Sequence, residues 1–367
     1  MNDKFCKFFK NGLVYNNNTT QFTASPCCYF DKSYPIDPND DVNEQFSNYK
    51  TTWLSADTNK SCRVCNNQER SGIPSYRQSA NDLIQEDTNN LVMLTIAVNK
   101  KCNLACPTCD AGSSSMWYRE NIRNNALQPL SIIDMHQEDN EHLITKKFLT
   151  LFETQDLSNL RYIKFGGGEP FMNDTHLQIL KMIPNADKIT VQYTSNFSIM
   201  PTRAVFKEWE RFHLIKWIAS VDGIKDQFEF LRWPYKWDKF LEFKQKAFAI
   251  VPTNVMFGVE HTLNPLNIFY YDQFENWFNE EFSVNRLGDE SDLNLHYANG
   301  MMALEKTNNE IRNLITKKYS SNHKIPLLLT QVPRLPESGL INYLDTIDKW
   351  RSTSWRKIFP DIEKYYV

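Results

Sequence analysis

The sequence predicts an α/β protein whose parallel strands form a partial (β/α)6 barrel of the TIM type, preceded by a small irregular N-terminal region that contains five of the eight cysteines. Short apolar, β-rich runs alternate with helix-like segments between residues 91 and 297, a pattern typical of parallel βαβ units. About six such units are too few for a closed eight-stranded barrel. All eight cysteines lie before residue 110, which confines any cysteine-ligated group to the first third of the chain.

The strands and helices are expected from these alternating runs. We expect strands over residues 91–98, 160–165, 188–193, 214–221, 254–263 and 293–297. We expect helices over residues 113–125, 143–154, 175–182, 204–212, 237–250, 269–282, 304–318 and 340–350. Residues 1–80 show little periodicity, and Asn16–Asn18, Pro35 and Pro38 predict loops there. The expected organisation is therefore an N-terminal region (1–85), a barrel (86–300) and a C-terminal helical extension (301–367).

Composition excludes several classes of function. The net charge is −3 and the isoelectric point is about 6.2, so no basic excess predicts binding to nucleic acid or to anionic membranes. No run of apolar residues is long enough to span a membrane. Residues 1–15 make a poor signal peptide because no uninterrupted apolar core follows their positive charges. We therefore expect a cytoplasmic protein, in which clustered cysteines serve as metal ligands or redox groups more often than as disulfides.

The most informative stretch is Lys101–Gly112, which directly follows the first expected strand. It places Cys102, Cys106 and Cys109 in a Cys-x3-Cys-x2-Cys spacing. Three thiolates this close together can hold one iron–sulfur cluster. A cubane cluster has four irons and is usually held by four cysteines, so three ligands leave one iron open for another molecule.

The other cysteines form a second candidate site. They are Cys6, Cys27, Cys28, Cys62 and Cys65. Four cysteine positions, with one of the Cys27–Cys28 pair contributing, would give a poorly periodic segment the folding free energy that its core lacks. A structural zinc site, an iron–sulfur cluster and free structural cysteines all remain possible from the spacing.

Polar and glycine residues follow the next strands. Gly166–Pro170, Thr194–Asn196 and Asp222–Gly223 each stand at an expected carboxyl end, where ligand groups lie in parallel α/β folds. Glycines there let the backbone approach a ligand closely. Glu260 and His261 lie on the fifth of these strands, and one of them is expected to contact substrate.

Taken together, these motifs resemble those of the radical SAM superfamily. The cysteine loop after the first strand and the Gly-Gly-Glu-Pro run at 167–170 carry the resemblance. Tyr193-Thr194-Ser195-Asn196, Ser220-Val221-Asp222-Gly223 and Phe230-Leu231-Arg232-Trp233-Pro234 are similar to later motifs of the same family. The N-terminal region resembles a twitch or SPASM-like auxiliary-cluster region through its cysteines, Trp53 and Glu69-x2-Gly72-x2-Ser75-x-Arg77.

The resemblance implies a [4Fe–4S] cluster on Cys102, Cys106 and Cys109, with S-adenosylmethionine chelating the open iron. Reductive cleavage of that molecule yields a 5′-deoxyadenosyl radical, which abstracts a hydrogen atom from the substrate. The residues implied to contact S-adenosylmethionine are Gly167, Gly168, Glu169, Ser195, Asn196, Ser220, Asp222 and Arg232. Thr108 departs from the family pattern, because many relatives carry an aromatic residue there. The resemblance also favours an auxiliary [4Fe–4S] cluster as the group that the N-terminal cysteines hold.

The implied substrate is a peptide or protein, and the implied partner is an electron donor such as flavodoxin or ferredoxin. Two alternatives remain at this stage. One is a radical SAM enzyme that acts on a small molecule such as a sugar, nucleotide or amino acid. The other, from a different class, is a zinc-binding scaffold without catalytic activity.

Overall fold

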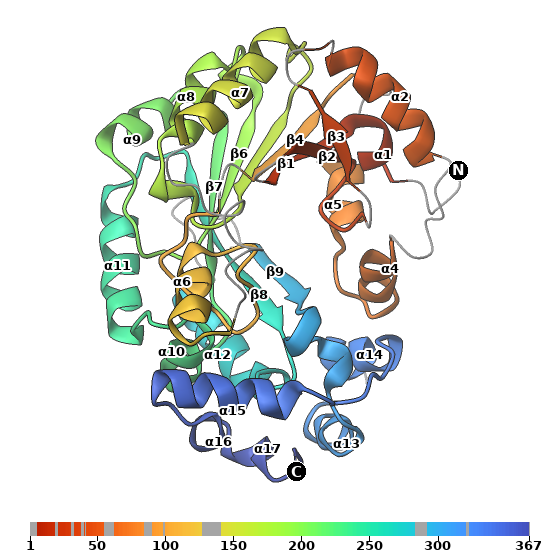
Figure 1. Cartoon of the computed structure of the whole chain (residues 1–367), viewed down its shortest axis with the longest axis vertical. Helices are drawn as coiled ribbons and strands as arrows, with labels where there is room; N and C mark the ends of the chain where they lie inside the picture. The colour runs from red at the N-terminus through yellow and green to blue at the C-terminus, as the bar shows by residue number, and fades with distance from the viewer. Residues whose placement is uncertain are drawn as a thin grey trace.

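The computed structural model describes most of the chain (Figure 1). It leaves out residues 1–5, 19–20, 31–32, 38–39, 41, 55–61, 84–89, 98–99, 127–140, 283–291, 321–322 and 367. The expected boundary at residue 85 and the end of the first expected strand, Val98, lie outside the described residues. All eight cysteines are described.

One nine-stranded sheet forms the centre of the molecule, in the order β3-β2-β1-β4-β5-β6-β7-β8-β9. The strands are β1 (Gly12–Asn18), β2 (Gln21–Ser25), β3 (Tyr34–Ile36), β4 (Met93–Ala97), β5 (Tyr162–Gly166), β6 (Thr190–Ser195), β7 (Leu214–Ser220), β8 (Val255–Leu263) and β9 (Asp292–Tyr297). From β1 through β4 to β9 every neighbouring pair is parallel. The α/β class is therefore confirmed, and the six expected strands are present as β4–β9.

The N-terminal region differs from the prediction. Residues expected to be irregular form β1, β2 and β3, and β1 extends the parallel sheet by pairing with β4. Asn16–Asn18, which predicted a loop, belong to β1 because their backbone pairs with β2 on one side and, at Asn16, with β4 on the other. Pro35 lies in β3, the outermost strand on that side of the sheet, and an edge strand tolerates proline because one side of its backbone needs no partner.

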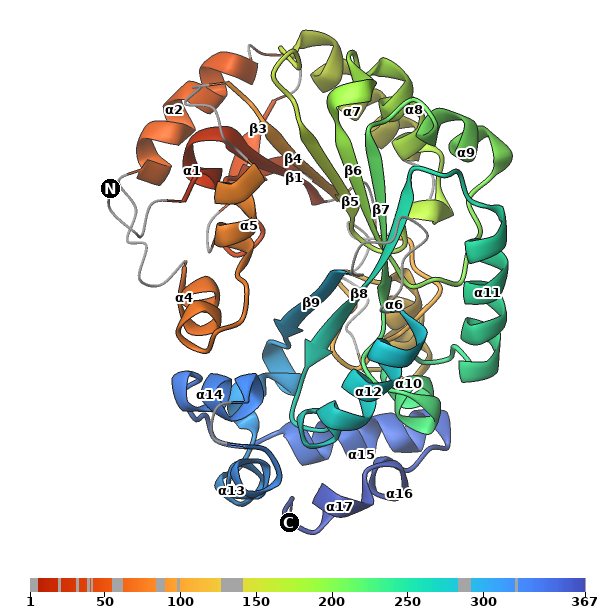
Figure 2. The same cartoon turned by 180° about the vertical axis from the view of Figure 1, so that it is seen from behind.

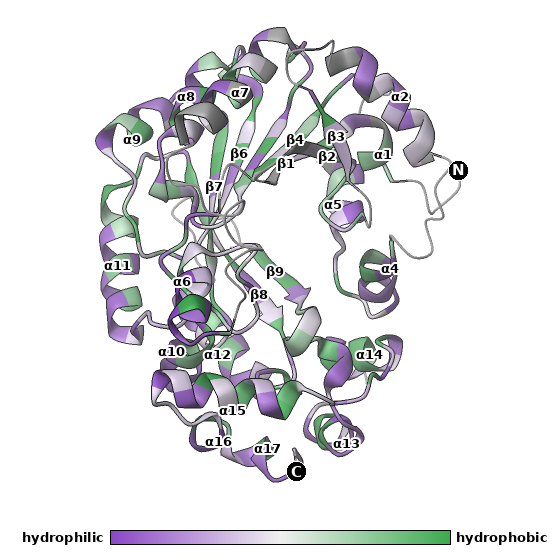
Figure 3. Ribbon diagram, viewed as in Figure 1, coloured by the Kyte–Doolittle hydropathy of each residue, from purple (hydrophilic) through white to green (hydrophobic). Residues whose placement is uncertain are grey.

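The helices surround the sheet (Figures 1 and 2). In the N-terminal half they are α1 (Phe8–Asn11), α2 (Val42–Leu54), α4 (Arg63–Arg70), α5 (Tyr76–Leu83), α6 (Ser115–Arg123), α7 (Glu141–Thr154) and α8 (Thr175–Met182). In the C-terminal half they are α9 (Arg203–Trp209), α10 (Lys225–Leu231), α11 (Trp237–Ile250), α12 (Tyr271–Glu281), α13 (Asn309–Lys318), α14 (Lys324–Gln331), α15 (Leu340–Arg351), α16 (Trp355–Ile358) and α17 (Pro360–Glu363). Every expected helix has a counterpart, whereas α1, α2, α4 and α5 of the region expected to be irregular, and α10, α14, α16 and α17, were not expected. Most helices show both hydrophilic and hydrophobic residues in Figure 3, as amphipathic helices on a core should.

The two faces of β5, β6 and β7 have different chemistry. Phe165, Tyr193 and Trp217 are register partners and fully buried, and they pack with helix residues such as Trp209. The register one residue earlier pairs Lys164, Gln192 and Lys216 across the same strands. Successive side chains point to opposite faces of a strand. One face therefore forms the aromatic core, and the other presents a polar row.

The N-terminal region also reaches the far end of the sheet. Gln68 of α4 donates a hydrogen bond of 2.7 Å to the carbonyl of Leu295 in β9, and Arg63 pairs with Glu305 at 3.2 Å. Figure 1 shows α4 beside α14, between the two ends of the strand order. Residues of the first eighty positions therefore contact both the first and the last parallel strands.

Candidate functional site

The cysteine loop lies between β4 and α6, and its own residues fix much of its shape. Ser114 caps α6 by accepting a hydrogen bond from the Trp117 backbone at 3.3 Å, and it donates one of 2.6 Å to the Leu104 carbonyl. The indole nitrogen of Trp117 donates to the Cys106 carbonyl at 2.6 Å. The helix after the loop therefore holds the backbone on either side of Ala105.

The glycine run after β5 packs directly against the start of this loop. The Glu169 backbone donates a 2.7 Å hydrogen bond to the Lys101 carbonyl. A Cβ atom placed on Gly168 would lie 2.1 Å from the same oxygen, so only glycine allows the approach. The glycine run therefore brings two loops into close contact at the carboxyl ends of the adjacent parallel strands β4 and β5.

Distant segments complete the support of the loop. The Ala105 backbone donates to the Trp233 carbonyl at 2.7 Å, and Arg351 donates to the Ala105 carbonyl at 2.8 Å. The Tyr343 hydroxyl donates to the Pro107 carbonyl at 2.8 Å. Arg351 and Tyr343 belong to α15, whose residues carry no sequence motif, so sequence reasoning missed them.

The three loop thiols lie near one another in a buried setting. Burial and then the neighbouring Cys106 raise the pKa of Cys102 to about 12, and the same two causes raise that of Cys109 to about 12. Burial also raises the pKa of Cys106, whereas the nearby Arg232 guanidinium opposes that rise. A metal would displace the thiol protons, since thiolate is the binding form.

Glu169 joins the ends of β5 and β6. Its side chain is 1% exposed, and it accepts hydrogen bonds from the Ser195 hydroxyl at 3.0 Å and the Asn196 backbone at 2.7 Å. Burial outweighs these hydrogen bonds and raises the pKa of Glu169 to about 7. Three residues predicted as ligand contacts therefore contact one another, and Glu169 positions Ser195 and Asn196.

Asn196 in turn reaches the cysteine loop. Its amide nitrogen donates to the Asn103 side-chain oxygen at 2.8 Å and lies 4.0 Å from the Cys102 sulfur. Asn103 also donates to the Ser198 hydroxyl at 2.8 Å. The end of β6 therefore contacts the loop at its first cysteine.

Asp222 and Arg232, two further predicted residues, form an ion pair of 2.8 Å beside the third strand end of the site. Asp222 is fully buried and also accepts a 2.7 Å hydrogen bond from the Thr262 backbone. The other arm of the Arg232 guanidinium lies 3.9 Å from the Cys106 sulfur. Burial disfavours the charged guanidinium, but Asp222 and Cys106 outweigh burial and keep the pKa of Arg232 above its usual value. Ser220 lies two residues before Asp222, at the end of β7, and is buried.

The N-terminal cysteines gather from three segments. Burial raises the pKa of Cys6 to about 12, with further increases from Cys65 and Cys62. Burial likewise raises the pKa of Cys27, to which Cys28, Cys6 and Cys65 add. Cys6, Cys27, Cys62 and Cys65 therefore act on one another electrostatically.

Cys28 has different surroundings. Its side chain is exposed into a cavity of 580 Å³. Burial raises the pKa of Cys28 to about 11. The ammonium of Lys164 in β5 opposes this rise, and Cys65 adds to it. Of the two adjacent cysteines, Cys27 is the one whose pKa is raised by both Cys6 and Cys65, so it is grouped with Cys6, Cys62 and Cys65.

The Glu69, Ser75 and Arg77 positions of the N-terminal motif also meet. Arg77 forms an ion pair with Glu69, and its Nε donates to the same carboxylate at 2.9 Å. Ser75 donates to Glu69 as well. Gly72 between them has a φ of +70°, which favours glycine. Burial raises the pKa of Cys65, and hydrogen bonds from Arg77 and Ser75 oppose that rise. The Glu69, Ser75 and Arg77 group therefore lies next to the Cys65 thiol.

Within the described residues, no group of three or more His, Cys, Asp or Glu side chains is arranged to hold a single metal ion. The thiolates of a [4Fe–4S] cluster each bind a different iron, whereas the four ligands of zinc converge on one ion at about 2.0–2.3 Å.

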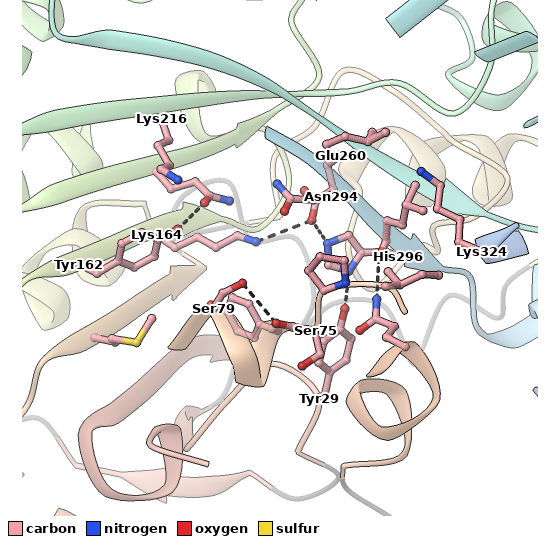
Figure 4. Close-up of a pocket in the computed structure, with 18 residues that line it drawn as sticks. Tyr29, Ser75, Ser79, Tyr162, Lys164, Lys216, Glu260, Asn294, His296 and Lys324 are labelled. Atoms are coloured by element: carbon pink, nitrogen blue, oxygen red, sulfur yellow. Dashed lines mark hydrogen bonds and ion pairs between the residues drawn. The ribbon is translucent and has the colours of Figure 1, made fainter. Parts of the chain in front are cut away.

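Glu260 and His261 turn out to have separate roles. Glu260 lines the 580 Å³ cavity and an adjoining cavity of 440 Å³, binds His296 at 2.6 Å and lies 3.7 Å from Lys164 (Figure 4). His261 instead packs against Phe274 with ring centroids 3.9 Å apart, and burial lowers its pKa to about 4. Sequence reasoning missed Lys164 and His296, because the strands that bring them together are far apart in the chain.

Two cavities flank the cysteine loop. The 580 Å³ cavity is lined by Lys100, Gly112 and Gly167 among others. A cavity of 660 Å³ is lined by Thr108 and Cys109 of the loop together with Tyr343 and Trp350 of α15. Both volumes lie in the range of small-molecule sites.

Comparison with known proteins gave no family assignment. No protein-family model matches the chain. No curated protein matches it significantly. In the part of the chain that the structure describes, no helix has the length and apolar character needed to cross a bilayer.

Some solved structures are similar to this chain at low sequence identity. Native anSMEcpe with bound AdoMet and Cp18Cys peptide matches with a TM-score of 0.38 and 12% identity, over 62% of this chain and 58% of that chain. Streptococcus suis SuiB bound to S-adenosylmethionine matches with a TM-score of 0.29 and 10% identity, over 81% of this chain and 73% of that chain. The match thus spans little more than half the length of anSMEcpe.

Proposed function

We propose that this chain is a radical SAM enzyme that cleaves S-adenosylmethionine reductively and abstracts a hydrogen atom from a substrate. The observation that carries the proposal is the contact between the cysteine loop and the glycine run. Gly168 fits against the Lys101 carbonyl, with three neighbouring thiols on the loop. These features lie at the carboxyl ends of parallel strands, where α/β folds bind their ligands.

A [4Fe–4S] cluster fits the residues of the loop. Cys102, Cys106 and Cys109 would hold three of its irons, and the fourth iron would receive S-adenosylmethionine. Asn196 and Arg232 direct N–H groups toward the sulfurs of Cys102 and Cys106 at 4.0 and 3.9 Å. Hydrogen bonds and charge near cluster sulfurs tune a cluster's reduction potential, so both side chains would adjust the ease of reduction.

With its cofactors bound, such a site supplies one-electron cleavage of the sulfonium bond and a 5′-deoxyadenosyl radical. The chain's own residues position the reactants and exclude water. Gly167 and Gly168 would present backbone groups to the methionine end, with Glu169, Ser195, Asn196, Ser220, Asp222 and Arg232 around it. Tyr343 and Trp350 line the cavity next to Thr108 and would provide the aromatic surface that Thr108 lacks.

The N-terminal cysteines would hold an auxiliary [4Fe–4S] cluster of the twitch or SPASM-like type. Cys6, Cys27, Cys62 and Cys65 are our proposed ligands, because Cys65 raises the pKa of each of the other three. Cys28 is not a proposed ligand, and it lines the neighbouring 580 Å³ cavity. We also propose the division into residues 1–85, 86–300 and 301–367, a partial barrel, a peptide or protein substrate, and a flavodoxin or ferredoxin as electron donor.

The test is product formation in the absence of oxygen. Protein with reconstituted clusters, dithionite and S-adenosylmethionine should release 5′-deoxyadenosine. A Cys102→Ala, Cys106→Ala, Cys109→Ala variant should release none above the background without protein. Equal release by the variant and the wild type, or none by the wild type, contradicts the proposal.

A further inference from the structure

Arg351, the last residue of α15, contacts the backbone immediately before Cys106. Its Nη2 donates a 2.8 Å hydrogen bond to the carbonyl of Ala105, which belongs to the peptide bond that leads into Cys106. Its guanidinium carbon lies 4.8 Å from the ring centroid of Trp117, and the Trp117 indole donates to the Cys106 carbonyl. The guanidinium is thus tied, directly or through Trp117, to the peptide groups on both sides of Cys106.

Glu120 of α6 holds this guanidinium in a two-point ion pair. Arg351 donates from Nε at 2.9 Å and from Nη2 at 2.6 Å to the two oxygens of the Glu120 carboxylate. The Arg351 side chain is only 1% exposed, and that of Glu120 is 12% exposed. Charges withdrawn from water are screened less than charges on the surface. The pair therefore acts on its surroundings more strongly than a surface ion pair does.

Within this pair, the positive member is the one in contact with the cysteine loop. Burial raises the pKa of Cys106, and the guanidinium of Arg232 and, less strongly, that of Arg351 oppose the rise. Both arginines therefore favour negative charge on this sulfur. Reduction adds an electron to a cluster, and charge and hydrogen bonding around the sulfurs set how readily it is accepted. A positive charge at this place favours the reduced state.

Anchoring the loop does not require the whole guanidinium. Nε and Nη2 make the hydrogen bonds to Glu120 and Ala105, whereas Nη1 is buried without a hydrogen-bond partner among the residues that the structure describes. An unpaired buried N–H group is unfavourable and uncommon. A smaller neutral donor could hold the Ala105 carbonyl without that cost. A full guanidinium at this position therefore favours a role for its charge.

We propose that Arg351 is a positioning residue whose charge raises the reduction potential of a [4Fe–4S] cluster on Cys102, Cys106 and Cys109. This inference rests on the proposed function, because it concerns the cluster that would receive the electron. Glu120 opposes the effect, since its carboxylate compensates part of the Arg351 charge. Helix α15 would thus adjust how readily the site accepts the electron that cleaves S-adenosylmethionine.

The experiment measures the reduction potential of the loop cluster in the reconstituted full-length protein. Electron paramagnetic resonance follows stepwise reduction with dithionite in the absence of oxygen, and the loop cluster is the signal missing from the Cys102→Ala, Cys106→Ala, Cys109→Ala variant. Arg351→Met should make this cluster about tenfold harder to reduce, which is a lowering of about 59 mV for one electron. Arg351→Lys keeps the positive charge and should stay close to the wild-type potential.

Glu120→Gln gives the deciding comparison. Loss of the carboxylate leaves the Arg351 charge uncompensated, so the potential should rise, whereas Arg351→Met should lower it. Both variants disturb the same ion pair, so a merely structural role would move the two potentials in one direction or leave both unchanged. Arg356→Met is the matched control and should keep the wild-type potential. Arg356 also pairs with a carboxylate, that of Asp345, and lies over a tryptophan ring, but its side chain is 41% exposed.

Unchanged potentials, or shifts of the same sign, in Arg351→Met and Glu120→Gln would overturn the role of Arg351. So would a potential in Arg351→Lys as low as that in Arg351→Met. If Arg351→Met loses its iron, Glu120→Gln decides alone, because its amide oxygen still accepts a hydrogen bond from Arg351. The wild type is also assayed for 5′-deoxyadenosine. Cleavage with unchanged potentials refutes only the role of Arg351, whereas opposite shifts without cleavage refute only the proposed function.

Discussion

The two cysteine sets of this protein are built in different ways. Cys102, Cys106 and Cys109 lie within one continuous loop whose backbone is fixed by α6, by the glycine run and by α15. The N-terminal set draws Cys6, Cys27 and the Cys62–Cys65 pair from three separate segments. A loop site is therefore largely shaped by the polypeptide, whereas a dispersed site depends on its bound group to stay together.

Each set also has an arginine–carboxylate pair beside a cysteine, and the two pairs differ in burial. Asp222 of the Arg232 pair is fully buried. The Glu69 side chain of the Arg77 pair is 20% exposed and has Ser75 as a further partner. The loop set thus relies on contacts that cannot be exchanged for water, and the N-terminal set relies on contacts that partly can.

The sharpest way to separate the two sets is Gly168→Ala. Its Cβ would meet the Lys101 carbonyl at 2.1 Å, so the loop must move, and we expect about a hundredfold less 5′-deoxyadenosine formation because small displacements at reacting centres have effects of that size. Gly166→Ala is the matched control, since nothing lies within 4 Å of a Cβ there. Gly168→Ala should lose iron from the loop and keep that of the N-terminal set. Wild-type activity in Gly168→Ala would refute the role of this contact.

The paired arginines give the second test. Arg232→Met leaves a buried carboxylate uncompensated, which typically costs about 3–5 kcal/mol of stability. Arg77→Met should cost only about 1–2 kcal/mol, because Glu69 reaches water and keeps Ser75. Thermal unfolding of both variants measures the difference, and adding Asp222→Asn to Arg232→Met should recover part of the loss. Equal losses in the two single variants would remove the distinction drawn between the pairs.

How much the sequence predicts also differs between the two regions. The strands β4–β9 were predicted because each is a short apolar run between helical segments. β1 was not, since Asn16–Asn18 favour a loop and its parallel partner β4 lies far along the chain. The Tyr29–His296 contact joins residues 267 positions apart, and no local pattern encodes it. The same holds for Tyr343 and Arg351, whose support of the cysteine loop depends on how α15 packs.

A smaller loss of stability should appear when the protein is acidified, because two histidines are buried. Burial lowers the pKa of His176 and of His261 to about 4, from an ordinary value of 6.5. The unfolded chain then binds more protons than the folded one, so stability is complete above pH 6.5 and is lost as the pH falls toward 4. Each histidine should cost about 2 kcal/mol at pH 5.

Thermal unfolding at pH 7 and pH 5 checks this for His176. His176→Asn keeps a partner for the Tyr193 hydroxyl, which His176 contacts at 2.9 Å, and should narrow the difference between the two midpoints. His213→Asn changes an exposed residue and should leave the difference as in wild type, including any part due to acid-labile clusters. An unchanged difference in His176→Asn would show that this histidine is not held neutral.

The metal content of protein purified without oxygen tests the central claim of two cluster sites most directly. We expect about eight irons and eight sulfides per chain, the content of two [4Fe–4S] clusters. About four irons should remain after Cys102→Ala, Cys106→Ala, Cys109→Ala, and about four after Cys6→Ala, Cys62→Ala, Cys65→Ala. Zinc in place of iron in the wild type, or full iron in the loop variant, would contradict the account.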